Sequence, residues 1–309
     1  MHPAPCTLPA RSSAARVQRV LSLGVLGCWL MALWPGHSAW WWAGALAHPG
    51  LLGLQFALAA WGSRGCVGRP GPWGWVKAWA REWGDSVRIF GWLQPWRWRA
   101  EPDHCPVQSL PQPARGVLLV HGYFCNRGMW SGWVRRLRVA GHPVIAINLE
   151  PLWGDIGTHG GLLAEAVARL QQASGGLPPL VVAHSMGGLV VRSWLAQQPD
   201  AWAHIHQVLT LGTPHHGTWL AWGGRGCNAR QMRWHSAWLQ ALAAAETTVP
   251  TERAQRFVCW HSLADNIVMP AGTGLWPGAE DRLLTDVGHM ALAEHPAVWA
   301  DVMARLQTR

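Results

Sequence analysis

The chain has 309 residues, which is enough for one full-sized domain and an appendage. Its formal net charge of +9 favours an anionic partner, either acidic lipids or nucleic acid. The seven cysteines form no CxxC pair and leave one over, which argues against a disulfide framework and against a zinc site. Nothing in the sequence calls for a metal or another cofactor.

The N-terminal region has the pattern of a membrane segment. Between Val20 and Ser63 there is no Asp, Glu, Lys or Arg, whereas arginines stand on both flanks. One bilayer crossing needs about 20 apolar residues. The stretch therefore predicts a hairpin of two transmembrane helices, Val17–Trp34 and Ala39–Trp61, with the turn at Pro35.

The basic residues predict the orientation of this membrane anchor, which comprises residues 1–63. Positive charge on both outer flanks, and none at the hairpin tip, places the rest of the chain on the cytoplasmic side of a bacterial inner membrane. The same charge predicts anionic lipids as partners. A cleaved signal peptide is the alternative, because Ala45–Ala47 supplies an AxA cleavage site, although a signal's apolar core has only about 7 to 15 residues.

Residues 64–113 predict a tryptophan-rich helix followed by a proline-rich linker from Glu101. Trp75, Trp79 and Trp83 recur at every fourth position, so they share one helix face. Two arrangements remain open: the helix lies along the membrane with this face toward lipid, or it packs on the domain that follows. Basic residues among aromatic ones also occur in single-strand nucleic-acid binders, but beside a membrane hairpin no nucleic-acid partner is expected.

From residue 114 to 309, short apolar runs alternate with helical stretches, which is typical of βαβ units around a mostly parallel sheet. The predicted strands are Gly116–Val120, Pro143–Asn148, Leu180–Ala183, Gln207–Leu211 and Arg256–Trp260. The predicted helices are Met129–Ala140, Leu162–Gln172, Gly187–Gln197 and Pro296–Gln307. Residues 218–250 are too long for a simple connection and predict a cap over an apolar site, with ordinary helical packing as the alternative.

The run LVVAHSMGGLVV has the pattern of a nucleophile elbow. Ser185 stands between an apolar strand and a helix, with Ala183 and Gly187 two residues before and after it. The turn is so tight that both of these positions need small residues, and the helix N-terminus helps to stabilise negative charge near the serine. Ser185 is therefore the predicted nucleophile.

Three motifs in order resemble the α/β-hydrolase superfamily, in its bacterial lipase and esterase branch. VLLVHGYFCNR resembles the oxyanion loop, AHSMGG the nucleophile elbow, and LGTPHHGT the TPHxG segment of that branch. The resemblance begins at about Gly116 and implies an α/β-hydrolase fold, here preceded by the predicted transmembrane hairpin. The hairpin and the tryptophan-rich helix lie outside it.

The resemblance also implies the chain order nucleophile, acid, base. His289 is the predicted base, with His295 as the alternative. Asp265 is the predicted acid, with Asp281 and Asp286 as rivals.

The resemblance further implies an oxyanion hole made by the backbone amides of Tyr123 and Met186, with Phe124 competing for the first place. His121 is expected to be a buried histidine that hydrogen-bonds this loop.

The predicted function is that of a membrane-anchored serine hydrolase that cleaves apolar or lipid-like carboxylic esters through an acyl-enzyme. The same triad serves amidases, thioesterases and acyltransferases, because fold and triad do not fix the leaving group or the acceptor. A catalytically idle membrane scaffold is the alternative from another class.

Overall fold

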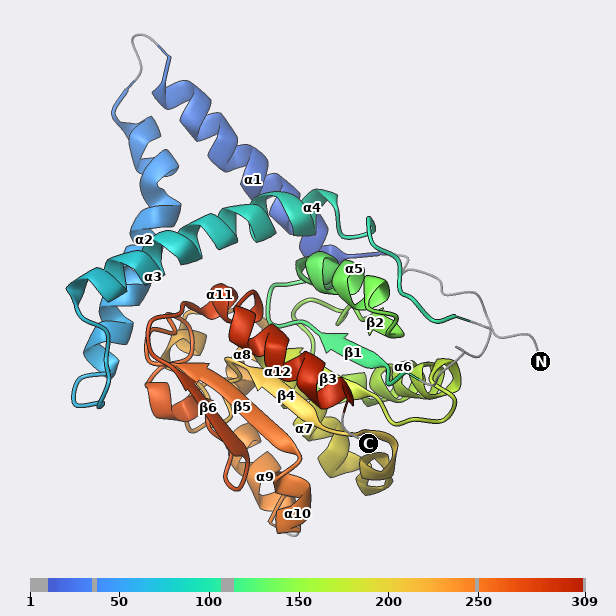
Figure 1. Cartoon of the computed structure of the whole chain (residues 1–309). Helices are drawn as coiled ribbons and strands as arrows, with labels where there is room; N and C mark the ends of the chain where they lie inside the picture. Colours follow the sequence, from blue (N-terminus) through green and yellow to red (C-terminus); the bar gives the residue numbers. More distant parts are fainter. Residues whose placement is uncertain (1–10, 35–37, 107–113, 248–249, 308–309) are drawn as a thin grey trace.

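The computed structural model describes residues 11–34, 38–106, 114–247 and 250–307. In these residues the chain forms a six-stranded parallel sheet with the strand order β2-β1-β3-β4-β5-β6 (Figure 1). The strands are β1 (Val117–Val120), β2 (Val144–Ala146), β3 (Leu180–His184), β4 (Val208–Leu211), β5 (Phe257–Ser262) and β6 (Glu280–Leu284). We call residues 114–307 the sheet domain.

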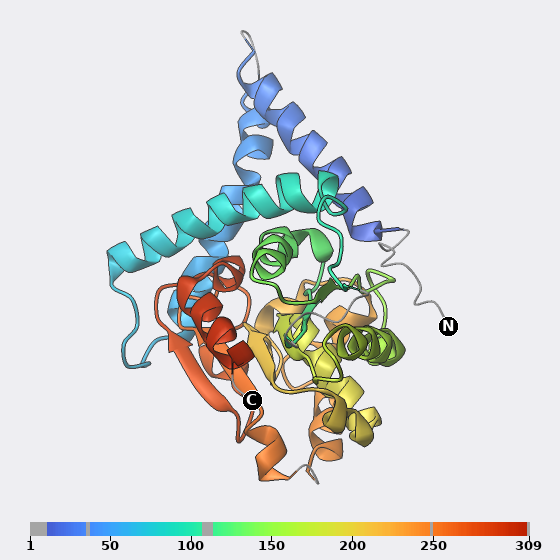
Figure 2. The same cartoon turned by 45° about the vertical axis from the view of Figure 1, so that its right-hand side comes forward.

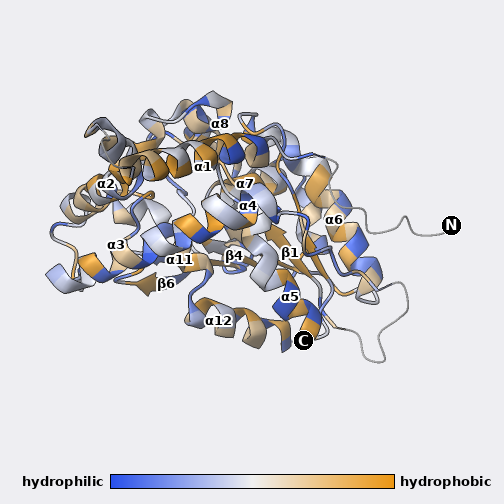
Figure 3. Ribbon diagram, turned by 90° about the horizontal axis from the view of Figure 1, so that it is seen from above, coloured by the Kyte–Doolittle hydropathy of each residue, from blue (hydrophilic) through white to orange (hydrophobic). Residues whose placement is uncertain are grey.

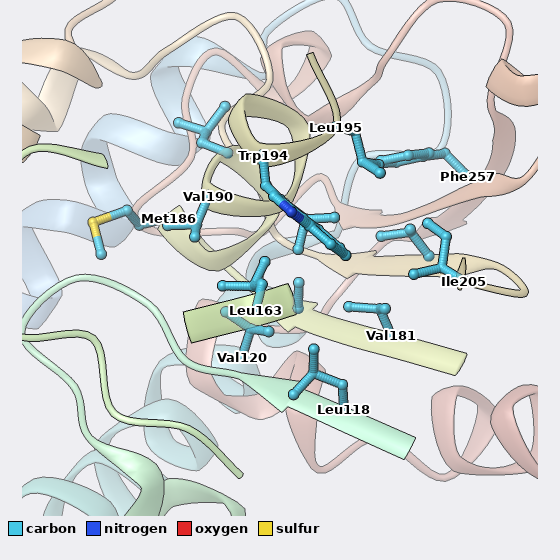
Figure 4. Close-up of a cluster of buried hydrophobic side chains, with 14 of the residues drawn as sticks. Leu118, Val120, Leu163, Val181, Met186, Val190, Trp194, Leu195, Ile205 and Phe257 are labelled. Carbon is cyan, nitrogen blue, oxygen red and sulfur yellow. The ribbon is translucent and has the colours of Figure 1, made fainter. Parts of the chain in front are cut away.

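Helices cover both faces of the sheet (Figure 2). Leu118 and Val120 of β1 pack in one core cluster with α6 and α7, whereas Val117 and Leu119 pack in the other with α5 and α12. Figure 4 shows part of the first cluster, in which Trp194 lies over the strands. The bounds of the four helices are α5 Ser131–Val139, α6 Gly160–Ala173, α7 Met186–Gln197 and α12 Pro296–Gln307. Burial on both faces explains why these strands read as continuous apolar runs.

The five predicted strands are confirmed to within two residues at either end, and the four predicted helices are confirmed as well. Strand β6 was not predicted. Its sequence, EDRLL, contains three charged residues and is largely exposed at the edge of the sheet, paired with β5 alone. Charged side chains are a common means of protecting a sheet edge, and they remove the apolar pattern that marks a strand in sequence.

The segment 218–250, predicted as a cap, contains α8 (Gly226–Gln231) and α9 (Ala237–Ala245) in its described part. α9 packs on α7. The amide of Cys227, in α8, donates a hydrogen bond to the carbonyl of Trp153. A short helix, α10 (Thr251–Ala254), follows.

The two N-terminal helices, α1 (Ser13–Ala32) and α2 (Trp40–Gly62), form a hairpin whose tip projects from the sheet domain (Figure 1). Many of their apolar side chains are exposed. In Figure 3 much of the α1 ribbon has the colour of hydrophobic residues. By length and hydropathy, α2 is the one helix in the described part of the chain that could span a membrane, a criterion that core helices and signal sequences also meet. The predicted turn at Pro35 lies outside the described residues.

Helix α3 (Pro72–Ser86) continues through a π-helical segment, Val87–Leu93, into α4 (Gln94–Trp96). α3 crosses α2 beside the sheet domain, and α4 packs against α1 (Figures 1 and 2). Trp75 and Trp79 pack on Phe56 of α2. The tryptophan face therefore contacts both the hairpin, at Phe56, and the sheet domain, at Ala264. We call α1 to α4 the N-terminal helices.

Candidate active site

Ser185 stands on a tight turn between β3 and α7, with φ 56° and ψ −128°. Such a conformation is strained for a residue with a side chain and is typical of nucleophile elbows. A Cβ atom at Gly187 would lie 2.8 Å from the carbonyl oxygens of both Val120 and His121. The turn is thus pressed against the end of β1, which explains the small residue at this position. Thr213, in the loop after β4, donates a hydrogen bond of 2.8 Å to the Ser185 carbonyl and restrains the elbow.

His289 and Asp265 meet beside this elbow. Nδ1 of His289 lies 2.9 Å from Oδ2 of Asp265, and both side chains are buried. The other carboxylate oxygen of Asp265 accepts hydrogen bonds of 2.8 Å from the amides of Ile267 and Val268. The carboxylate is therefore held in place from its own loop while it orients the imidazole.

The rival residues lie elsewhere. Asp281 accepts a hydrogen bond of 2.7 Å from His261, and Asp286 is exposed. His295 accepts a hydrogen bond from the Ala297 amide at the start of α12. None of these three lines the cavity described below.

The electrostatics of His289 suit a general base. Burial alone would lower its pKa, but the carboxylates of Asp265 and Glu82 outweigh this effect and raise the pKa above its usual value of 6.5. The ring of His184 packs against the ring of His289, and the two ring centroids are 4.6 Å apart. Burial, followed by the charge of His289, holds the pKa of His184 well below the usual range, so that this neighbour is neutral.

The oxyanion loop, residues 121–126, lies directly on the serine. A Cβ atom at Gly122 would stand 3.2 Å from Oγ of Ser185. Tyr123 and Phe124 follow and line the same cavity as Ser185, and Phe124 has φ 57°. Met186 is the first residue of α7, where a helix amide has no intrahelical acceptor. Each predicted donor is therefore close to the serine in the chain or in space.

His121 supports this loop, as the sequence analysis expects. Its Nε2 accepts a hydrogen bond of 2.9 Å from the Leu149 amide, and its Nδ1 lies 2.9 Å from the Gly122 carbonyl. Burial lowers the pKa of His121 to about 4. A neutral ring that donates from Nδ1 and accepts at Nε2 satisfies both contacts.

Ser185 and His289 line one cavity of about 240 Å³. Much of its wall comes from the N-terminal helices, including Leu51 and Leu52 of α2 and Ser86 of α3. No residue of the described part of 218–250 contributes to it. The N-terminal helices therefore border the candidate active site directly.

Four buried or half-buried polar side chains connect these helices to the loops that carry the site. They are Gln18 of α1, Gln55 of α2, Glu82 of α3 and Gln94 of α4. Gln55 accepts a hydrogen bond of 2.9 Å from Asn266, whose own oxygen accepts one of 3.1 Å from the His289 amide. Sequence reasoning missed all four. Only Gln55 gave a signal in the sequence, as the one polar residue in the run GLLGLQFALAA.

Comparison with known proteins supports the fold described above. Residues 116–253 match the family model for the alpha/beta hydrolase fold. The sheet domain therefore has the α/β-hydrolase fold. From here on we call residues 114–307 the hydrolase domain.

Two solved lipases share the fold of the hydrolase domain. The mature form of a Bacillus licheniformis lipase has 18% sequence identity and a TM-score of 0.56, and the match covers 66% of this chain and 96% of that one. Aspergillus fumigatus lipase B has 18% identity and a TM-score of 0.57, with coverage of 69% and 57%. The match thus spans little more than half of the fungal enzyme.

Proposed function

We propose that the protein is a serine hydrolase that cleaves carboxylic esters with apolar acyl groups, using Ser185, His289 and Asp265. One observation carries the proposal: a strained serine and a histidine that is hydrogen-bonded to a buried aspartate line the same cavity. The apolar part of the lining, which includes Leu51, Phe90 and Ile267, favours an acyl chain. The likeness in fold to two lipases supports the same class.

In this mechanism His289 takes the proton of Ser185 as Oγ attacks the acyl carbon, and Asp265 holds the imidazole tautomer and stabilises its positive charge. The amides of Tyr123 and Met186 stabilise the oxyanion of the tetrahedral intermediate. His289 then gives the proton to the departing alcohol. Water attacks the resulting acyl-enzyme, again with His289 as base, and releases the acid and free Ser185.

The proposed location of the enzyme is a membrane surface, with the N-terminal hairpin as its anchor and lipid-like esters as its substrates. The exposed apolar residues of α1 and α2 and the arginines on both flanks support membrane contact. Anionic lipids are the proposed partners, and the hydrolase domain is proposed to face the cytoplasm.

A fluorophosphonate probe tests the proposal, because it labels activated serines whatever the natural substrate. We expect the full-length protein in detergent to be labelled and Ser185→Ala to be unlabelled, with esterase activity reduced on the order of a millionfold. The substitution removes one oxygen and little volume, so unfolding should be unaffected. Retention of more than about a tenth of the activity would contradict the role of Ser185.

The substrate class follows from a panel of p-nitrophenyl esters of graded chain length, with the matched anilides and thioesters. Turnover of esters that rises with chain length supports the proposal. Preference for the anilides or thioesters would assign the same triad to an amidase or a thioesterase.

A further inference from the structure

Glu82 is an acidic residue of the N-terminal helices, buried inside the protein with its carboxylate against the helix that begins with His289. Its side chain is 1% exposed. Both carboxylate oxygens accept a hydrogen bond from the Met290 amide, at 2.8 and 3.0 Å, and one also accepts from Ala291 at 3.1 Å. These are the second and third residues of α11, His289–Ala293.

The carboxylate takes the place of a missing N-cap. Gly288 is the N-cap residue of α11 and has no side chain with which to accept the first amides of the helix. A Cβ atom at Gly288 would lie 2.5 Å from Oε2 of Glu82, so the space of a local cap is filled by a residue some 200 positions away in the chain. A serine or aspartate at position 288 would serve if capping were the whole requirement. The observed arrangement also brings a carboxylate from α3 to His289.

The titratable groups around His289 come from three parts of the chain. Asp265 follows β5 and bonds Nδ1, Glu82 belongs to α3, and neutral His184 of β3 packs against the ring. The hydrogen bond that the His289 amide donates to Asn266 involves no charge. Asp85, one turn beyond Glu82, is engaged with Arg81 and Arg88.

Burial raises the pKa of Glu82 to about 7, although the amides of Met290 and Ala291 and the charge of His289 act in the opposite direction. Burying a carboxyl group is unfavourable unless its partners compensate. Glu82 also raises the pKa of His289. The two groups are thus electrostatically linked, and His289 is more readily protonated when Glu82 is ionised.

We propose that Glu82 is a positioning residue of the active site, which holds α11 and stabilises the imidazolium of His289 from outside the hydrolase domain. This inference rests on the proposed role of His289 as the base for Ser185. It makes α3 part of the machinery that sets the geometry of His289. Glu82 itself acts through α11 and through its charge, and it takes no part in bond changes.

The test measures the rate of fluorophosphonate labelling as a function of pH, with the full-length protein in detergent. Glu82→Gln removes the charge but keeps one acceptor for the α11 amides. Glu82→Asp keeps the charge but withdraws it by one methylene. Asp85→Asn is the matched control, because it removes one acidic group from the same helix, one turn away from the site.

We expect Glu82→Gln to be labelled roughly 10- to 100-fold more slowly than the native protein, as for a catalytic group displaced by a fraction of an ångström. The acidic limb of its pH profile should move to lower pH, because His289 loses a neighbouring negative charge. Glu82→Asp should be slower with its acidic limb near the native position. Asp85→Asn should match the native protein in both measurements.

A Glu82→Gln profile with the native midpoint and a rate within twofold of Asp85→Asn would overturn the inference. If Glu82→Gln does not fold, the test rests on Glu82→Asp. A native labelling rate in Glu82→Asp would then overturn the inference. Absence of labelling in the native protein would instead contradict the proposed function. The two failures are therefore distinguishable.

Discussion

The side-chain amide of Gln18, in α1, donates a hydrogen bond of 2.7 Å to the backbone carbonyl of Phe124 in the oxyanion loop. Gln94 of α4 holds the same loop by accepting a hydrogen bond of 2.7 Å from the Asn126 amide. Gln18 also bonds Gln94, at 3.2 Å. Two helices outside the hydrolase domain thus restrain the backbone in which the proposed oxyanion donor lies.

Gln18→Ala should therefore lower kcat with little change in KM. The loss of this restraint lets the loop with Phe124 and its positive φ relax, and a displaced donor stabilises the oxyanion less well. Removal of a whole donor costs about 100- to 1000-fold, so the expected decrease is smaller, about tenfold. Val20→Ala, on the same helix but exposed, is the control. Equal kcat values for the two variants would show that the oxyanion loop keeps its conformation without Gln18.

Deletion of residues 1–100 should abolish labelling of Ser185 or leave the remaining chain insoluble. The deletion removes the four polar side chains that hydrogen-bond the oxyanion loop, Asn266 and α11. Each buried polar group that is left without a partner destabilises the fold by about 1 to 3 kcal/mol. It also exposes the apolar surface under α3. A soluble deletion variant that reacts with the probe at the native rate would contradict this prediction.

Much of the hydrolase domain could be predicted from sequence because its signals are local. A parallel strand buried on both faces is a run of Val, Ile and Leu, and the elbow around Ser185 has a fixed pattern of small residues. The roles expected for His289 and Asp265 were implied by the order nucleophile, acid, base in the family that the sequence resembles. Strand β6 could not be predicted, because its side chains are largely exposed at the sheet edge and show no apolar periodicity.

The contribution of the N-terminal helices could not be predicted for the opposite reason. Gln55 and Asn266 are 211 residues apart, and Glu82 and Met290 are 208 apart. The sequence of a helix does not indicate the distant partner of one of its polar side chains, since the contact depends on how the elements pack after folding. The charge-free stretch and its flanking arginines therefore predicted a membrane anchor with no part in the active site. In the structure, α2 and α3 border the cavity.

Asp265→Asn should reduce kcat by about 10⁴-fold while leaving the fold intact. An amide oxygen can still accept the hydrogen bonds from Ile267 and Val268, but an amide nitrogen facing Nδ1 favours the wrong imidazole tautomer. Asp281→Asn and Asp286→Asn are the controls and should keep most of the activity. If Asp286→Asn is the most impaired of the three, the acid lies in the His289 loop instead.

Activity should fall as pH decreases through the pKa of His289, because a protonated imidazole cannot accept the proton of Ser185. Since the carboxylates of Asp265 and Glu82 raise this pKa, the acidic limb of kcat/KM should lie above the usual histidine value of 6.5. The measurement is kcat/KM for an uncharged soluble ester between about pH 5 and 9. A midpoint below 6.5 would mean that burial of His289 outweighs its two acidic neighbours.

The exposed apolar face of the hairpin should be required for membrane contact and dispensable for chemistry. Leu26 and Leu30 lie one turn apart in α1, and both are more than half exposed. Moving an aspartate into the apolar part of a bilayer is unfavourable by up to about 2.5 to 3.5 kcal/mol. The double variant Leu26→Asp, Leu30→Asp should therefore bind vesicles that contain an anionic phospholipid at least about tenfold more weakly.

The same double variant should hydrolyse a soluble ester at the native rate, because neither leucine lines the cavity or belongs to a described core cluster. Val139→Asp is the matched control, since it adds a charge at an exposed apolar position on α5 of the hydrolase domain. Flotation of both proteins with vesicles, alongside the soluble-ester assay, separates binding from chemistry. Native flotation of the double variant would show that the hairpin does not enter the bilayer, whereas loss of soluble-ester activity would show that the hairpin tip supports the active site as well.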